Sequence, residues 1–470
     1  MAQIKWVWQN LKGYRKRYIF ALCSTVFLSA TMMVNSIIIS QIMDTIFVPI
    51  QNGGAVTSAV INSLVKLIVM LITWSVIRTA FEYVSVMTYE KCSQGLIYKL
   101  RGDLYKNMQR QDMSFFSENR TGDLMTRLTG DMDMIRHTVA WISRMTIDCV
   151  VLFVSTTVIF FVKDALFATC MLLVTPIIFV ITMIFSKKVG PLYVDLREKL
   201  SQLNTCAQEN ISGNRVVKAF AREKYEADKF EEKNKDFKEA NLKATLLWLK
   251  FAPYVDGISQ SLSIAVLLVG GLFLINGRIT IGTFTLFNSL CWTLANPMRS
   301  IGMLLNDIQR FFASATKIIE LHNATPSIKN DKNSQTSVFN KDDKNSASRI
   351  KGEIKFENVS LKLHDTVVLS DINLNIKAGE TVAIMGSTGC GKTSLINLIP
   401  RFSDVTKGIL TLDGKEIKKW NLQDLRHSIG MATQDVFLFS DTVDSNIAYG
   451  DSDMPEEEVA KYAKIADVNF

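Results

Sequence analysis

The chain has 470 residues, and its 53 lysines and arginines against 45 aspartates and glutamates give a formal net charge of +8. At roughly 150 residues per domain, this length allows about three domains, and the mildly basic balance lacks the excess expected of a nucleic-acid-binding protein. The apolar fraction of 48% is ordinary for a globular chain. The apolar residues are nevertheless gathered into long uncharged stretches, which exclude a purely soluble protein.

The N-terminal residues 1–14 are predicted to form a short elbow helix at the membrane interface. The segment AQIKWVWQNL over residues 2–11 carries Trp6 and Trp8, whose rings suit the headgroup layer. Simple disorder of this segment is the alternative. Basic residues cluster just after it, whereas residues 44–65 contain no lysine or arginine. By the positive-inside rule, we expect the N-terminus to be cytoplasmic.

Six membrane spans are predicted within a transmembrane domain over residues 15–322. A helix of about 20 apolar residues crosses the hydrocarbon layer and satisfies its own backbone. Four stretches contain no charged residue, and two more follow when charges near the ends are tolerated. The predicted spans are 18–43, 60–86, 140–162, 165–186, 257–277 and 279–305. A buried core helix is the alternative for 149–162, but Lys163-Asp164 favours a tight hairpin of two spans. Six spans place both termini in the cytoplasm.

Two inner segments, 87–136 and 187–250, are too polar for the membrane but keep apolar residues at helical spacing. We expect them to continue the spans as helices out of the bilayer. Residues 323–350, rich in asparagine, serine and charged residues, cannot bury a core and are predicted to be a flexible linker.

The pattern of apolar and polar residues changes again from residue 351. Short β-type runs at 354–359, 381–386, 409–414 and 429–433 alternate with turn dipeptides and helical patterns. This alternation predicts a mixed α/β domain over residues 351–470. The fold class is therefore multi-domain, with a six-helix α-helical transmembrane domain followed by a partial α/β domain.

A phosphate-binding motif lies within that domain. GSTGCGKT at 386–393 satisfies G-x-x-x-x-G-K-[ST], between an expected strand at 381–385 and an expected helix at 394–399. Glycines let the loop turn its N–H groups onto phosphate, the lysine supplies positive charge, and the Thr393 hydroxyl is placed to ligate Mg²⁺. The candidate nucleotide-binding residues are Gly386, Ser387, Thr388, Gly389, Cys390, Gly391, Lys392, Thr393 and Ser394. The Cys390 thiol occupies a variable position and is expected to be incidental.

With these features the chain resembles a half-transporter of the ATP-binding cassette (ABC) exporter family. TGDLMTRLTGDMDMIR at 121–136 and ISGNRVVKAFAREKYE at 211–226 are similar to the two long intracellular loops of that family. The resemblance implies coupling helices near 115–125 and 219–226. The stretch 425–450 resembles the surroundings of the family's Q-loop, which makes Gln434 the glutamine expected to touch Mg²⁺ and the γ-phosphate.

The resemblance also implies activity and partners. It implies ATP-driven export with ATP and Mg²⁺ as cofactors, in a bacterial plasma membrane. The partners implied are a second half-transporter subunit in a homodimer or heterodimer, membrane lipid, and a small-molecule, lipid or peptide substrate, with no nucleic acid.

Two departures from the family pattern matter. Leu363 falls where relatives stack adenine on an aromatic residue, and His364 or a neighbour is the candidate substitute. The printed chain also stops before the family's signature motif, Walker B acid, catalytic glutamate and switch histidine would be reached. We expect this chain alone not to hydrolyse ATP and to be a fragment of a longer protein. The alternative is a catalytically inert nucleotide-binding membrane subunit.

Ionisable residues near the predicted membrane boundaries are candidates for a central cavity, because ionisable groups avoid lipid. Interfacial snorkelling or an ion pair within the chain is the alternative for each of them. These residues are Arg144, Asp148, Asp256 and Arg299.

Overall fold

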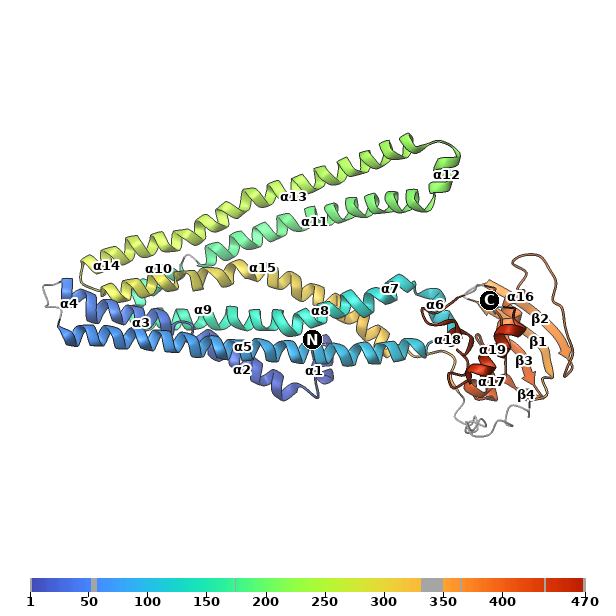
Figure 1. Cartoon of the computed structure of the whole chain (residues 1–470). Helices are drawn as coiled ribbons and strands as arrows, with labels where there is room; N and C mark the ends of the chain where they lie inside the picture. Colours follow the sequence, from blue (N-terminus) through green and yellow to red (C-terminus); the bar gives the residue numbers. More distant parts are fainter. Residues whose placement is uncertain are drawn as a thin grey trace. The chain divides into compact units, whose positions relative to one another are not determined.

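The computed structural model in Figure 1 describes residues 2–51, 57–173, 175–330, 350–363, 366–434 and 437–467. Contacts divide the chain into two compact units. Unit 1 comprises Met1–Arg110 and Asn119–Thr325, and unit 2 comprises Gln111–Glu118 and Pro326–Phe470. The segment between α5 and the next long helical stretch therefore contributes eight residues to unit 2.

Unit 1 is helical throughout its described elements, and several of its long helices contain π-helical turns. Its α-helices are α1 (Ala2–Asn10), α2 (Arg15–Thr31), α3 (Val34–Ile42), α4 (Val48–Gln51), α5 (Ser58–Gln109), α7 (Thr121–Thr126), α8 (Met132–His137), α9 (Ser143–Lys163), α10 (Ala165–Leu172), α11 (Thr175–Ser212), α12 (Asn214–Ala219), α13 (Glu223–Ala265), α14 (Gly271–Ile275) and α15 (Ile281–Asn323). The π-helical turns are η1 (Met43–Phe47), η2 (Arg127–Asp131), η3 (Thr138–Ile142) and η4 (Val266–Gly270).

Three stretches of the described chain are long and apolar enough to cross a membrane. They are Arg15–Ile50, Ser58–Gln109 and Thr121–Lys163, and two shorter apolar helices cover Ala165–Ile177 and Gln260–Ile275. Helices also occupy most of the other predicted ranges: the fourth is divided between α10 and α11, and α15 covers the sixth from Ile281 onward. The total of six spans therefore stays a prediction.

The predicted tight turn at Lys163-Asp164 is confirmed, because α9 ends at Lys163 and α10 begins at Ala165. That both arms of this hairpin span the membrane stays a prediction. The Asp164 carboxylate accepts a hydrogen bond from the Phe167 N–H at 2.8 Å and caps α10. It also pairs with the Arg278 guanidinium at 2.8 Å. Desolvation alone would raise the pKa of Asp164, but the bonds from Arg278 and Phe167 prevail and lower it. The turn after α14 is thereby tied to the α9–α10 hairpin.

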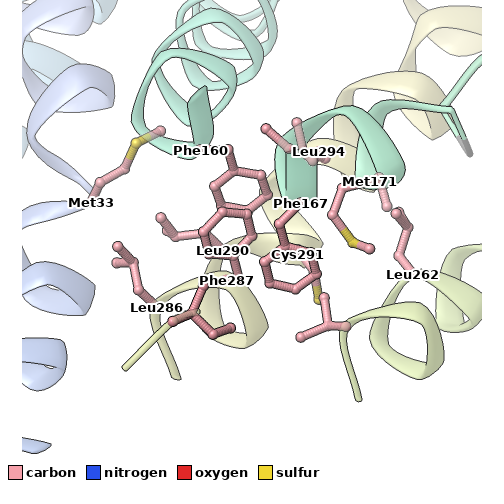
Figure 2. Packing of buried hydrophobic residues seen from close by; sticks show 14 residues of the cluster. Met33, Phe160, Phe167, Met171, Leu262, Leu286, Phe287, Leu290, Cys291 and Leu294 are labelled. Carbon is pink, nitrogen blue, oxygen red and sulfur yellow. The ribbon is translucent and has the colours of Figure 1, made fainter. Parts of the chain in front are cut away.

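An aromatic cluster holds α15 against this hairpin (Figure 2). The Phe287 ring is stacked between Phe160 and Phe167, with centroid distances of 4.0 and 4.2 Å. All three side chains are fully buried, and Met33 and Leu262 extend the cluster toward α2–α3 and α13. Because large aromatic side chains dominate core energetics, this cluster fixes the relative placement of α9, α10 and α15.

The predicted inner extensions are helical, because α5, α11 and α13 continue far beyond their apolar segments. In Figure 1, α11 and α13 run side by side and are joined through α12. The bounds expected for the coupling helices are wrong. Residues 115–125 divide into α6 (Met113–Glu118) and α7, and 219–226 contains the turn between α12 and α13. Ala221 in that turn has a φ of 50°, which a continuous helix cannot accommodate.

Unit 2 contains a four-stranded antiparallel sheet in the order β2-β1-β3-β4. Its elements are α6, β1 (Ile354–Leu363), β2 (Thr366–Ile376), α16 (Lys392–Leu398), β3 (Lys407–Leu412), β4 (Lys415–Glu416), the short 3-10 helix η6 (Ile417–Lys419), α17 (Leu422–His427), α18 (Val443–Ile447) and α19 (Glu456–Ile465). Apolar residues of β1 and β3, including Phe356, Val359 and Leu410, pack against Leu395 and Leu398 of α16. The core of unit 2 therefore lies between the sheet and α16.

The strand predictions are confirmed in part. The runs at 354–359 and 409–414 correspond to β1 and β3. The runs at 381–386 and 429–433 form no strand. A strand requires a hydrogen-bonded neighbour, and no strand of the described chain pairs with either run. Val382, Ile384 and Met385 are accordingly exposed.

The predicted linker over 323–350 is described only in part. α15 ends at Asn323, the residues up to 330 are irregular, and 331–349 lie outside the described residues.

Candidate nucleotide-binding site

The candidate phosphate loop leads directly into α16. Gly391 is the N-cap of this helix, and Lys392 and Thr393 form its first turn. Leu395 and Leu398, further along α16, are buried in the core of unit 2. The start of the helix, where backbone N–H groups lack partners within the helix, is thus positioned by packing of its apolar face.

Two glycines of the loop adopt conformations that other residues rarely adopt. Gly389 has a φ of 84° and Gly391 a φ of 93°. A Cβ atom at position 391 would also lie 2.9 Å from the Leu369 Cδ2 atom and 3.2 Å from the Val368 carbonyl oxygen. Position 391 therefore requires glycine for both backbone conformation and space.

The Lys392 side chain folds over the loop that precedes it. Its Nζ atom donates hydrogen bonds to the carbonyl oxygens of Gly386 at 2.8 Å and Ser387 at 2.7 Å. The Cys390 Sγ atom lies 3.7 Å from the same ammonium. The positive charge is thereby held beside the loop backbone. Ser387 and Thr388 are exposed, Ser394 is half-buried, and the exposed Thr393 is accessible to an ion in solution.

The chemistry of these residues suits the binding of a nucleoside triphosphate with Mg²⁺. The glycines leave the loop backbone without side chains that would block a phosphate group. The positive charge of the Lys392 ammonium is opposite to that of phosphate. The exposed Thr393 hydroxyl offers an oxygen ligand of the kind that Mg²⁺ prefers.

Gln434 is placed apart from these contacts. It is exposed in an irregular segment after 429–433, and no hydrogen bond or ion pair within the described chain joins it to the loop. Downstream of it, the Asn446 side chain bonds to both backbone groups of Phe439 and orders the segment before α18. Leu363 ends β1 with its side chain partly exposed, and His364 lies outside the described residues. The structure thus brings the residues of the phosphate loop together, but it shows no contact between Gln434 and this loop.

Sequence reasoning missed a carboxylate that organises the entry to α6. Asp112 accepts hydrogen bonds from the Phe115 N–H at 3.1 Å and from the Ser327 N–H at 2.7 Å. The hydroxyls of Ser114 and Ser327 bind the same carboxylate. Desolvation alone would raise the pKa of Asp112, but these four bonds hold it far below its ordinary value. An aspartate directly before a helix is a sequence signal for an N-cap. No such local pattern in the sequence indicates that Ser327 binds the same carboxylate.

Comparison with known families decides the identity of the chain. The family model for the ABC transporter transmembrane region matches residues 18–298, which is more than half of the chain. The family model named ABC transporter matches residues 369–469 and includes the phosphate loop. The chain belongs to the ABC transporter family. This ABC transporter chain is accordingly an integral membrane protein with fused membrane and nucleotide-binding regions.

Among its relatives, the ATP-dependent lipid A-core flippase of Syntrophus aciditrophicus is 33% identical over 394 residues, or 84% of this chain and 64% of the relative. The flippase of the same name from Desulfotalea psychrophila is 29% identical over 98% of this chain and 78% of the relative. A Bacillus subtilis protein named as a candidate multidrug export ATP-binding/permease protein is 26% identical over 100% of this chain and 79% of the relative. The chain thus spans less than two thirds of the first relative.

Proposed function

We propose that this ABC transporter subunit is one half of a dimeric ATP-driven exporter, with ATP bound at residues 386–394. Gly391, whose conformation and surroundings admit only glycine, is the observation that carries the nucleotide site. The fusion of a membrane region with this loop supports transport as its use. The names of the relatives, lipid A-core flippase and multidrug export protein, support export as the direction.

In this proposal each residue of the phosphate loop has its own role in binding ATP and Mg²⁺. The backbone N–H groups over 386–391 cradle the β-phosphate. Lys392 would exchange its two carbonyl partners for phosphate oxygens, and Thr393 and Gln434 would hold Mg²⁺. Bound Mg²⁺ supplies charge neutralisation at the phosphates, and the residues of this chain supply position.

The membrane region converts nucleotide binding into movement through its intracellular loops. α6 is folded with unit 2 although it belongs to the loop after α5. Closure of two nucleotide-binding regions on ATP would therefore move α6 and, through the chain on each side of it, α5 and α7. The second loop, with α12 and residues 219–226, belongs to unit 1, and its coupling role in this proposal rests on the resemblance of residues 211–226 to the second intracellular loop of the family.

The proposed assembly is a pair of half-transporter subunits, identical or different, in a bacterial plasma membrane with both termini in the cytoplasm. The substrate is a small molecule, lipid or peptide, and no nucleic acid is involved. An aliphatic side chain such as that of Leu363 lacks the flat face on which adenine stacks. In this proposal a residue other than Leu363 therefore contacts the adenine ring.

Binding of Mg²⁺-ATP to the purified full chain tests the nucleotide site. We expect Lys392→Ala to weaken binding at least tenfold, because it removes the charge held beside the loop. Lys461→Ala is the matched control, since Lys461 is an exposed lysine of α19 far along the chain from the motif. Equal affinity of the wild type and Lys392→Ala would refute the site.

ATP-dependent uptake into inverted membrane vesicles tests export itself. Uptake by the wild type that disappears in Lys392→Ala supports the exporter. Nucleotide binding without hydrolysis or uptake by the natively expressed protein would instead assign the inert-subunit role.

A further inference from the structure

The first 43 residues of the chain carry charge of one sign only. They contain no aspartate or glutamate, whereas the rest of the chain has 48 basic against 45 acidic residues. Within the described residues, none of the basic side chains of this segment forms an ion pair with a carboxylate. A basic surface without its own counter-charges attracts anions from outside the chain. Its basic residues are Lys5, Lys12, Arg15, Lys16 and Arg17.

α1 presents one side to the protein and another to its surroundings. The Val7 side chain is buried against unit 1. Ile4 and Trp8, one helical turn apart, are 55% and 36% exposed. Lys5 and Lys12 lie on the same side and are exposed as well. The outer side of α1 therefore combines apolar and cationic side chains, which is the composition of a helix that lies in the interface of an anionic membrane.

The inner side of α1 contacts the end of α15. The Gln3 side-chain amide donates a hydrogen bond to the Thr316 hydroxyl at 3.1 Å. The Trp6 and His322 rings meet edge to face, with 5.4 Å between their centroids. Because α15 ends at Asn323, α1 rests on the last turns of this helix.

The turn after α1 is fixed by two further contacts. The Tyr14 ring lies so close to Gly95 of α5 that a Cβ atom at position 95 would overlap it. The Arg15 Nε atom donates to the Trp8 carbonyl oxygen at 2.9 Å, and the guanidinium lies over the Trp8 ring at 5.5 Å from its centroid. The charge of Arg15 is thereby held beside the outer side of α1.

The basic residues end where the first predicted span begins. Lys16 and Arg17 are exposed, and the exposed apolar residues Ile19 and Phe20 follow them on α2. The positive charges therefore lie at the boundary of the hydrocarbon layer, on the side that the positive-inside rule predicts to be cytoplasmic. Phospholipid headgroups occupy this boundary.

We propose that α1 and the basic residues after it dock onto anionic phospholipids of the cytoplasmic leaflet, and that this docking holds α1 on the end of α15. These lipids are ligands at the outer boundary of the protein and not the transported substrate. The basic side chains pair with lipid phosphates, while the two apolar side chains lie among the headgroups. Each basic residue near an anionic membrane surface contributes about fivefold to binding. The docking surface comprises Ile4, Lys5, Trp8, Lys12, Arg15, Lys16 and Arg17.

Hydrogen exchange of the full chain in lipid nanodiscs tests this docking without a variant. Discs of phosphatidylcholine are compared with discs in which one third of this lipid is replaced by phosphatidylglycerol with the same acyl chains, at low salt and without nucleotide. We expect the amides of α1 to exchange at least fivefold more slowly in the anionic discs. At about 1 M salt, where the Debye length is about 3 Å, the difference should fall below twofold. Equal exchange in both discs at low salt would overturn the proposal.

Phosphatidylserine and inorganic phosphate identify the ligand. Phosphatidylserine carries the same net charge as phosphatidylglycerol on a different headgroup, so we expect it to slow exchange to the same extent within about twofold. Inorganic phosphate in millimolar excess, added to discs of phosphatidylcholine, should leave exchange unchanged. Equal protection by inorganic phosphate would overturn the lipid assignment in favour of a soluble anion. Protection by only one of the two anionic lipids would overturn a surface that selects by charge.

Two triple variants locate the effect on the chain. Replacing three lysines of the docking surface should reduce the difference between the two kinds of disc below twofold, while exchange in phosphatidylcholine stays as in the wild type. The control removes three exposed lysines of α13, where acidic residues are interspersed, and should keep the fivefold difference. A difference that survives in the first variant, or disappears equally in the control, would overturn the assignment. The first variant is Lys5→Gln, Lys12→Gln and Lys16→Gln, and the control is Lys235→Gln, Lys238→Gln and Lys243→Gln.

The amides in the last turn of α15 show whether docking reaches beyond α1. In the wild type we expect them to slow together with those of α1 in anionic discs. Trp6→Ala removes the ring that contacts His322 and should abolish this response of α15. A response that persists in Trp6→Ala would overturn the link to α15.

This proposal and the nucleotide site fail separately. Lys392→Ala should keep the lipid effect on α1, because no nucleotide is present in the exchange experiment. Loss of the lipid effect with intact Mg²⁺-ATP binding would overturn the docking surface alone.

Discussion

Replacement of Asp112 by alanine removes the carboxylate that connects the start of α6 to the segment after α15. The side chain receives four hydrogen bonds, two from within its own turn and two from Ser327, which lies 215 residues further along the chain. Loss of an aspartate N-cap costs about 1 kcal/mol. The half-exposed bonds to Ser327 add roughly 1 kcal/mol, below the range for buried bonds to charged groups. The opening free energy of this contact should fall by about 2 kcal/mol.

Hydrogen exchange of the full chain, resolved to single amides, measures that opening directly. The amides of Phe115 and Ser327 donate to Asp112, and a loss of about 2 kcal/mol accelerates their exchange roughly 30-fold. Asp123→Ala is the control, because its carboxylate accepts no hydrogen bond within the described chain and lies in the first turn of α7. Exchange at both amides within twofold of the wild type would refute the reasoning.

The pH dependence of the same contact has a defined sign. Because the pKa of Asp112 is lowered in the folded state, its contribution is complete above the unfolded pKa of about 3.9 and is lost as the pH falls toward the folded value. Protection of the two amides, corrected for intrinsic exchange, should therefore be constant from about pH 5 to 8. A decline between pH 8 and 6 would show that another group controls this contact.

Two further substitutions test packing in each unit. Gly408→Ala places a Cβ atom against the Asn358 carbonyl oxygen at a φ of 80°, and we expect it to lower the stability of unit 2 by about 3 kcal/mol; an unchanged thermal midpoint of the full chain would contradict this. Asp164→Asn weakens the pair with the largely exposed Arg278, and a double-mutant cycle with Arg278→Gln should give a coupling free energy of at most about 1 kcal/mol. A coupling of 3 kcal/mol or more would show that the pair is effectively buried.

Local signals in the sequence determined much of this protein. Apolar stretches without charge predicted the helices around the aromatic cluster, and the Lys163-Asp164 dipeptide predicted the hairpin that the structure contains. Alternating apolar residues predicted β1 and β3. The motif at 386–393 predicted a glycine-rich loop followed by a helix, and α16 begins at Lys392. Each of these signals is contained within a few turns or one strand, where residue type and spacing are sufficient.

Tertiary contacts decided the rest. The run at 381–386 has the composition of a strand but no partner in the described chain, and strand formation depends on that partner. Sequence reasoning selected Arg144 and Asp148 as candidates for a cavity but not Arg78 and Glu82, because only the packing of α5 against its neighbours brings the four charges to one cavity. The side chains of Asp256 and Arg299, selected with them, lie outside the described part of the structure.

The contact between Asp112 and Ser327 shows the physical reason most directly. The sequence contains an aspartate before a short helix, and that pattern predicts the bond to Phe115. It contains no sign that a serine 215 residues away completes the site. Hydrogen bonds within one turn follow from local geometry, whereas bonds between distant segments exist only after the chain has folded.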